Sequence, residues 1–130
     1  MNIVLMIHSL WRWVVVIVAL IALVKFGIGW LRHNKPDDLD RRLTSFFTIA
    51  IDIQVLLGIL LLALQAINGV LLRVGIEHSV VMIVAAVIAH LTAIWRKRDD
   101  NTVLRNNFFD VLAVLILIAL GVARVGGWSF

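Results

Sequence analysis

Two histidines with matching neighbours are the residues of this chain whose type and position could do chemistry. His8-Ser9 lies near the start of the first apolar segment, and His78-Ser79 lies at the start of the third. Histidine is costly inside a membrane segment and usually faces the interior of a helix bundle or a functional pathway. Two neutral imidazoles that reach the bundle axis from diagonal helices could hold one metal centre between them, as in a b-type haem.

One further side chain lies a helical turn from each histidine. Arg12 follows His8 by four residues, where it could pair with a haem propionate or with Glu77. Met82 follows His78 by four residues, where it could pack on a porphyrin or act as a weaker axial ligand. We predict that His8, His78, Arg12 and Met82 bind the cofactor, with the two histidines ligating the haem iron. Two alternatives remain open: ordinary polar residues near the membrane surface, or ligands to the magnesium of a chlorophyll.

A second polar group lies toward the other end of the apolar segments. Ser45, Thr48 and Asp52 fall on one helical face, at positions i, i+3 and i+7. His90 in the third segment and Asp110 in the fourth lie at roughly the same depth. An unpaired carboxylate is costly there, so Asp52 is expected to be protonated or paired, with His90 as its partner. The group could form a quinone site, a proton path or the support for a second cofactor, or it could be a buried pair that only fixes helix packing.

The spacing of the histidines predicts one haem b rather than two. His78 and His90 are 12 residues apart, which turns a helix by about 120° from alignment at 3.6 residues per turn. The two rings therefore face different directions, and the first segment has no second histidine at the matching depth. His33 lies in a connection between segments and is expected to be solvated.

The composition of the chain indicates a membrane protein. Of its 130 residues 62% are apolar and 15% are charged, and the mean hydropathy is +1.04, whereas a soluble domain is about half apolar and about a quarter charged. The chain has no cysteine, which excludes disulfides, thiolate metal sites, iron–sulfur clusters and cysteine nucleophiles. Since the sequence shows no nucleophile with a base and no glycine-rich phosphate loop, an electron-transfer or accessory role is favoured over a stand-alone enzyme.

Four apolar segments separated by short polar connections are predicted to be transmembrane helices. They cover about residues 3–31, 46–67, 78–95 and 108–125, and each meets the roughly 20 residues that a helix needs to cross the hydrocarbon core. Lipid-spanning strands would need a closed barrel, which this pattern cannot form. Because short connections make sequential helices antiparallel neighbours, we predict that residues 1–130 form a single all-α domain, an up-down-up-down bundle of four transmembrane helices.

The positive charges of the chain predict how the bundle is oriented. Nine of the twelve lysines and arginines lie in or beside the connections that follow the first and third segments: Lys25, Arg32, Lys35, Arg41, Arg42, Arg96, Lys97, Arg98 and Arg105. Short basic loops stay in the cytoplasm, so both termini are expected on the extracytoplasmic side of a bacterial plasma membrane. Lys25 is expected to snorkel to the inner headgroups. The same connections hold five aspartates and form no continuous phosphate-binding patch, so nucleic acid is not an expected partner.

The chain also carries a faint internal duplication, with halves of roughly 1–67 and 68–130. The histidine-serine pairs correspond, and a phenylalanine pair opens the second apolar segment of each half. Parallel repeats about an axis along the membrane normal would place His8 and His78 at the same depth. Ala85, Ala89 and Ala93 continue the face of the second histidine, which favours close helix packing or leaves room for a flat macrocycle.

Several short motifs in the first three segments carry a family resemblance. They are His8 followed by Arg12-Trp13, Asp52-x-Gln54, and Glu77-His78 followed by Ala89-His90. The chain resembles small four-helix, b-type-cytochrome-like bacterial membrane proteins, broadly similar to cytochrome b561-type bundles. The resemblance implies haem b ligation by His8 and His78 and electron exchange with quinones. The chain departs from the pattern in the 12-residue spacing of the third segment.

Three functions follow as hypotheses. The first is a haem b electron-transfer protein or a cytochrome subunit of a larger redox complex. The second is a cofactor-free accessory or scaffold subunit of a respiratory or photosynthetic complex. The third is a small proton-conducting or transport protein that uses Asp52 and His90. In each case the expected partners are membrane lipids and either other membrane subunits or further copies of the chain.

Overall fold

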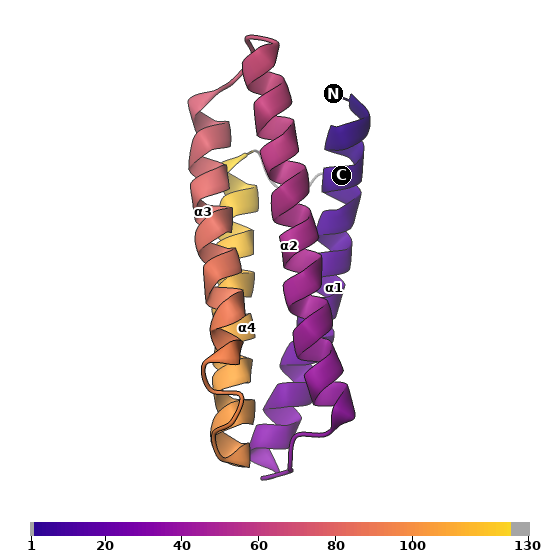
Figure 1. The fold of residues 1–130 in the computed structure, drawn as a ribbon, viewed down its shortest axis with the longest axis vertical. Helices are drawn as coiled ribbons and strands as arrows, with labels where there is room; N and C mark the ends of the chain where they lie inside the picture. The colour runs from indigo at the N-terminus through magenta and orange to yellow at the C-terminus, as the bar shows by residue number, and fades with distance from the viewer. Residues whose placement is uncertain (1, 126–130) are drawn as a thin grey trace.

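The computed structural model describes residues 2–125, which fold into four antiparallel helices arranged as a bundle (Figure 1). The helices are α1 (Asn2–Leu31), α2 (Asp38–Ile67), α3 (Arg73–His90) and α4 (Asp100–Arg124), and a short 3-10 helix, η1 (Leu91–Ala93), continues α3. No strand occurs in this part of the chain. The prediction of an all-α, up-down-up-down four-helix bundle is confirmed.

All four helices are long and apolar enough to cross a membrane. Large apolar side chains cover their outer faces, among them Ile17 on α1, Leu56 on α2, Val87 on α3 and Leu120 on α4, each more than half exposed. Water would make such a surface associate, whereas lipid tails are as apolar as these side chains. The chain is therefore a multi-pass membrane protein.

Three of the helices begin earlier than the apolar pattern predicted. α2, α3 and α4 start eight, five and eight residues before the predicted positions, and α3 with η1 ends two residues before its predicted end. A reciprocal capping box starts α2, because Asp37 accepts from the backbone N–H of Asp40 and Asp40 accepts from that of Asp37, each at 2.9 Å. Asp99 caps α4 by accepting from the backbone N–H of Thr102. These caps extend the two helices beyond their apolar parts as polar turns.

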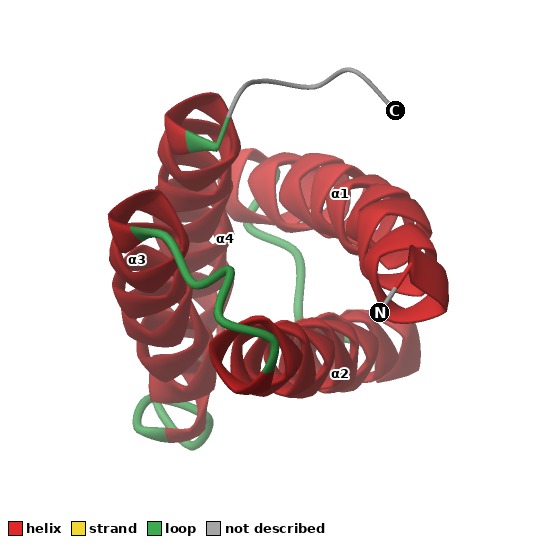
Figure 2. Cartoon of the chain, turned by 90° about the horizontal axis from the view of Figure 1, so that it is seen from above, coloured by secondary structure: helices red, strands yellow, loops and turns green. Residues whose placement is uncertain are grey.

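The helices pack in a ring in which α1 contacts α2 and α4, and α3 contacts the same two helices (Figure 2). α1 and α3 therefore lie on a diagonal of the bundle. Toward the connections the core is dense, with Phe26, Phe47 and Leu104 all buried. Ala85 and Ala89 are fully buried as well, so their four-residue spacing serves close helix packing, while Ala93 is exposed.

Burial along the chain follows the predicted repeat. The two histidines are 70 residues apart, and the same offset relates buried residues of α1 to buried residues of α3 and η1. These pairs are Val15 with Ala85, Ala19 with Ala89, and Ala22 with Thr92. Between α2 and α4 an offset of 63 residues relates the buried Ile51 to the buried Val114, one residue more than the offset of 62 between the phenylalanine pairs. The two hairpins thus present matching positions to one shared core, as a tandem repeat requires.

Lys25 anchors the connection between α1 and α2. Its Nζ donates to Asp37 and to Asp40, each at 3.0 Å, and Asp40 is itself buried. The charge of Lys25 is therefore paired within the protein, contrary to the expectation that it reaches the lipid headgroups. His33, in the same connection, is exposed as expected.

Acid should loosen the start of α2. The pKa of Asp37 is lowered from its ordinary 3.8 to about 2, because its carboxylate accepts a backbone hydrogen bond from Asp40 and another from Lys25. A carboxyl whose pKa is lower in the folded state stabilises that state at neutral pH, and this contribution disappears as the pH falls from about 4 through about 2.

Hydrogen exchange read by mass spectrometry tests this. Over that acid range, and after correction for intrinsic exchange rates, amides in the first turn of α2 should lose protection while those in the middle of α2 keep theirs. Unchanged protection in the first turn would contradict a stabilising role for the Asp37 cap.

Candidate functional site

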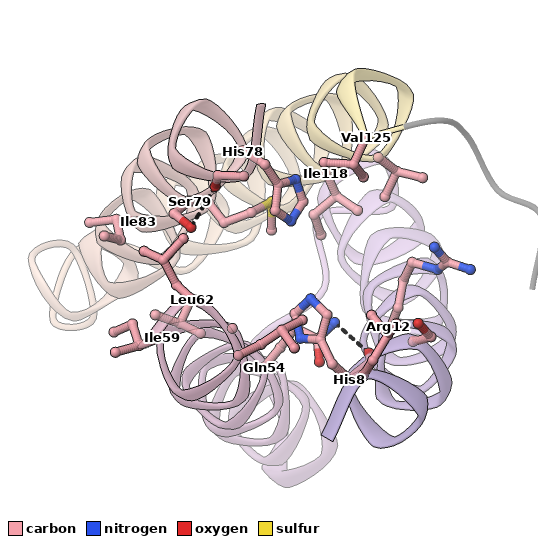
Figure 3. A pocket seen from close by; sticks show the side chains of 18 of the residues that line it. His8, Arg12, Gln54, Ile59, Leu62, His78, Ser79, Ile83, Ile118 and Val125 are labelled. Carbon is pink, nitrogen blue, oxygen red and sulfur yellow. Dashed lines mark hydrogen bonds between the residues drawn. The ribbon is translucent and has the colours of Figure 1, made fainter. Parts of the chain in front are cut away.

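The two histidines meet at the end of the bundle opposite the basic connections. His8 projects from α1 and His78 from α3, and the two rings face the same open space (Figure 3). Their ring centroids are 6.4 Å apart and their planes lie at 88° to each other. Two imidazoles from diagonal helices, one in each hairpin, thus come within reach of a single atom placed between them.

A backbone carbonyl of α4 orients His78. Its Nδ1 lies 2.8 Å from the carbonyl oxygen of Gly121, and since a carbonyl can only accept, Nδ1 carries the proton and donates it. The other ring nitrogen, Nε2, is then the one with a free lone pair. Histidines that ligate metals are usually oriented in this way by a hydrogen bond from the second ring nitrogen.

His8 is held through its backbone rather than through its ring. Gln54 of α2 donates from Nε2 to the carbonyl oxygen of His8 at 2.8 Å, the hydrogen bond drawn beside these two residues in Figure 3. The ring nitrogen Nδ1 of His8 is buried and has no hydrogen-bond partner among the described residues. A buried polar atom without a partner is uncommon in folded proteins and is often found at functional sites.

A glycine of the neighbouring helix makes room for each ring. A Cβ added at Gly58 of α2 would lie 3.3 Å from Cε1 of His8, and one added at Gly121 of α4 would lie 3.3 Å from Nδ1 of His78 and 3.1 Å from Sδ of Met82. The two glycines are 63 residues apart, the offset that relates α2 to α4 in the core. The tandem repeat therefore extends to the histidine sites, each made of one ring over one glycine.

The histidines line a partly open cavity of about 300 Å³ to which all four helices contribute side chains. Small-molecule sites usually span about 300–1,000 Å³, so this cavity is at the lower end of the range. Arg12 and Met82 also line it. The guanidinium of Arg12 points away from the two rings in Figure 3 and lies 5.3 Å from the ring centroid of Trp13, so in this conformation Arg12 turns its stem rather than its charge toward the histidines.

Glu77, a predicted partner of Arg12, pairs with two other arginines. Its carboxylate accepts from Nε of Arg73 at 3.1 Å and from Nε of Arg124 at 2.7 Å. The bond from Arg124 joins the beginning of α3 to the last turn of α4, whereas the bond from Arg73 lies within α3. Glu77 therefore closes the second hairpin above the histidine cavity.

The predicted pairing of Asp52 with His90 is confirmed. Nε2 of His90 lies 2.8 Å and 3.0 Å from the two carboxylate oxygens of Asp52, a contact that joins α3 to α2. The side chains are 46% exposed for Asp52 and 54% for His90, so the alternative of a buried pair is wrong. The pair faces the outer surface of the bundle, where lipid tails or a partner would touch it.

The five residues of the second polar group do not form one site. Ser45, Thr48 and His90 line a second cavity near the connections, whereas Asp52 reaches it only through His90. Asp110 is 5% exposed, and neither of its carboxylate oxygens has a hydrogen-bond partner within the described part of the chain. The interior position of Asp110 was not evident from its depth alone, because depth along α4 does not fix which face a residue occupies.

Three residues of the histidine site were not predicted as part of it: Gln54, Gly58 and Gly121. Gln54 was visible in the Asp52-x-Gln54 motif without an assigned role. The two glycines carried a usable signal, since they share the offset that relates the second helix of each hairpin. Glycines in apolar segments are common, however, and only contact with the rings distinguishes these two.

Comparisons with protein-family models, with curated proteins and with solved structures found no match to this chain. Fold and site geometry therefore carry the functional argument.

Replacing Asp110 by asparagine should cost little stability or even increase it, while the same change at Asp52 should destabilise. Asp110→Asn removes an unpartnered carboxylate from the interior, where an ionised group would be expensive. Asp52→Asn removes the negative charge and one of the two oxygens that contact His90, which weakens the pair. Side-chain hydrogen bonds in membrane proteins are worth about 0.6 kcal/mol on average and at most about 1.7 kcal/mol.

Equilibrium unfolding of the two variants and the parent chain in mixed micelles measures both effects, and Asp52→Asn serves as the matched isosteric control. If Asp110→Asn proved the more destabilising change, Asp110 would have to make a stabilising interaction in the folded protein.

Proposed function

We propose that this chain is a membrane-embedded electron-transfer protein that holds one haem b between His8 and His78, as a cytochrome subunit of a larger redox complex. The observation that carries the proposal is the convergence of these two rings, 6.4 Å apart, over glycines in an internal cavity. The resemblance to b-type-cytochrome-like bundles points the same way.

The separation of the rings suits one metal ion ligated by both. A metal–imidazole bond is about 2 Å long, and the ring centre lies about 1 Å beyond the nitrogen, so two opposed imidazoles on one metal have centroids about 6 Å apart. The observed 6.4 Å fits this value without movement of the backbone. Because the cavity holds about 300 Å³, we expect the apolar side chains around it to move apart when a porphyrin enters.

The ligand count favours a metal that brings its own equatorial ligands. Within residues 2–125 no group of three or more histidine, aspartate or glutamate side chains could hold a metal ion. Two histidines alone leave most positions of a metal open, and the four nitrogens of a porphyrin fill them. A chlorophyll would fill the open positions of its magnesium in the same way, and the optical spectrum distinguishes it from haem.

The residues of the chain have distinct tasks at such a site. His78 presents Nε2 because Gly121 accepts the proton of Nδ1, and Gln54 fixes the backbone that carries His8. Apolar neighbours such as Leu62 and Ile118 line the same cavity and keep water from the ligands, which tunes the potential of a buried centre. When bound, haem b supplies reversible one-electron transfer at its iron.

The charge distribution supports a bacterial plasma membrane orientation with both termini outside. In Figure 1 the connections α1–α2 and α3–α4 lie at the same end of the bundle, opposite the N-terminus, and they hold most of the lysines and arginines. Basic connections stay in the cytoplasm. The histidine site would then lie in the extracytoplasmic half of the membrane.

A quinone is the electron partner that we propose, with other membrane subunits or further copies of the chain beside it. Quinones dissolve in the lipid, and the Asp52–His90 pair is half exposed on the lipid-facing side of α2 and α3. A carboxylate-imidazole pair can accept the protons that a quinol releases on oxidation. The wide apolar surface of the bundle leaves room for protein neighbours.

Removal of either histidine should abolish the haem spectrum. The purified parent protein should show the sharp α-band of a reduced b-type cytochrome, and both His8→Ala and His78→Ala should lower bound haem by at least tenfold, because each removes one of two ligands. His33→Ala, in the exposed connection, is the matched control and should keep the full spectrum.

Circular dichroism should show that all three variants remain helical. A parent protein that is folded, supplied with haem and colourless would refute the proposal and favour a cofactor-free scaffold subunit. A magnesium-tetrapyrrole spectrum would replace the haem with a chlorophyll.

A further inference from the structure

The second cavity lies at the end of the bundle that carries the basic connections, far from the histidine site along the helices. It encloses about 460 Å³ between α2, η1 and the start of α4. Apart from His90, which also pairs with Asp52, the residues that line this cavity have no part in the proposed haem or quinone sites. What it could bind depends on the charges and donors in its wall.

Three arginines stand around this cavity: Arg41 on α2, and Arg96 and Arg98 in the connection to α4. Arg41 already pairs with Asp38. The guanidinium groups of Arg96 and Arg98 form no ion pair or hydrogen bond with any residue that the structure describes. These two side chains therefore bring positive charge that the fold leaves unneutralised.

The acidic residues of the wall do not cancel this charge. Asp40 lines the cavity, but its carboxylate accepts from Lys25 and from a backbone N–H. Asp100 is the remaining acid at the wall, and it opposes two arginines. The cavity is thus cationic in balance and suits an anion.

Hydroxyl groups and an imidazole form the deeper wall, toward the membrane interior. Ser45, Thr48 and His90 line it. The hydroxyl of Thr48 donates to backbone carbonyls of its own helix. Ser45 is exposed, and its hydroxyl can donate a hydrogen bond to a ligand. A phosphate oxygen accepts from hydroxyls as well as from arginines.

Two apolar side chains follow residues of the cavity wall in the sequence, Phe46 after Ser45 and Ile94 after Ala93. Both are more than half exposed, and in a membrane protein such surface meets acyl chains. A ligand here would have its charged part among arginines and its apolar part along the helices. Basic pockets between transmembrane helices at the membrane surface bind anionic lipid headgroups in this way.

We propose that this cavity binds the phosphate headgroup of an anionic phospholipid, with Arg96 and Arg98 as its principal contacts. The site does not rest on the proposed electron-transfer function, and it holds for either orientation of the bundle. Since the headgroup would bridge α2 to the α3–α4 connection, the lipid would also link the two hairpins at this end of the bundle.

Lipid titration followed by native mass spectrometry tests the site. The full chain, exchanged into zwitterionic phosphatidylcholine, is titrated with phosphatidylglycerol. We expect at least one tightly retained phosphatidylglycerol on the parent protein and at least a tenfold weaker apparent affinity in the double variant Arg96→Gln/Arg98→Gln. The matched control, Arg32→Gln/Lys35→Gln, removes the same charge from two exposed residues of the α1–α2 connection that do not line the cavity.

An equal loss of phosphatidylglycerol affinity in the two double variants would overturn the proposal, because it would show that the affinity depends only on the overall positive charge of the surface. Parent protein without preference for phosphatidylglycerol would overturn it as well. Glycerol phosphate is added as a competitor: displacement of the lipid only at large excess supports the lipid as the ligand, whereas displacement at equal concentration would assign the cavity to free phosphate esters instead. The haem content is recorded for every sample, so a failure here is separable from a failure of the histidine site.

Discussion

The lipid environment limits where this chain can place its few polar side chains. In water an imidazole or a carboxylate is solvated wherever it lies, whereas in hydrocarbon each needs a partner, a cavity or a position near the membrane surface. The chain meets this condition differently at each site: His78 donates to a carbonyl of α4, and Asp52 pairs with His90. Among the groups that do not meet it within the described residues are the ring nitrogen Nδ1 of His8, the amide oxygen of Gln54 and the carboxylate of Asp110. His8 and Gln54 both line the cavity that holds the two histidine rings.

The tandem arrangement of two hairpins explains how such a site can arise from a short chain. Each hairpin supplies one imidazole from its first helix and one glycine from its second. Because each helix packs against two neighbours, the first helices of the two hairpins lie on a diagonal of the bundle. Further along the helices, small buried residues such as Ala19 and Ala89 allow the helices to pack closely. A single hairpin could offer one ligand, and pairing two of them offers both at the same depth.

Much of this arrangement could be predicted from the sequence, and the rest depends on side-chain direction. Apolar segment length predicted the four helices, and the distance of His8 and His78 from equivalent ends predicted their common level. Helix starts were missed because the first turns of α2 and α4 are polar and are fixed by the aspartate caps, which hydropathy does not register. The directions of the Asp110 carboxylate and the Arg12 guanidinium were not predicted, for another reason. The depth of a residue follows from its number, whereas the face and the rotamer of its side chain follow from the packing of neighbouring helices.

Electron paramagnetic resonance of the oxidised, haem-loaded protein tests the histidine site most directly, because it reports the ligands of the iron and the angle between their planes. Two imidazoles at 88° should give a low-spin ferric signal of the strongly anisotropic kind, dominated by one feature at high g, that near-perpendicular axial planes produce. A high-spin signal would mean that at most one histidine ligates the iron, and a rhombic low-spin signal would mean that the rings do not hold the observed angle. Either result would contradict a haem bound between His8 and His78 as the structure presents them.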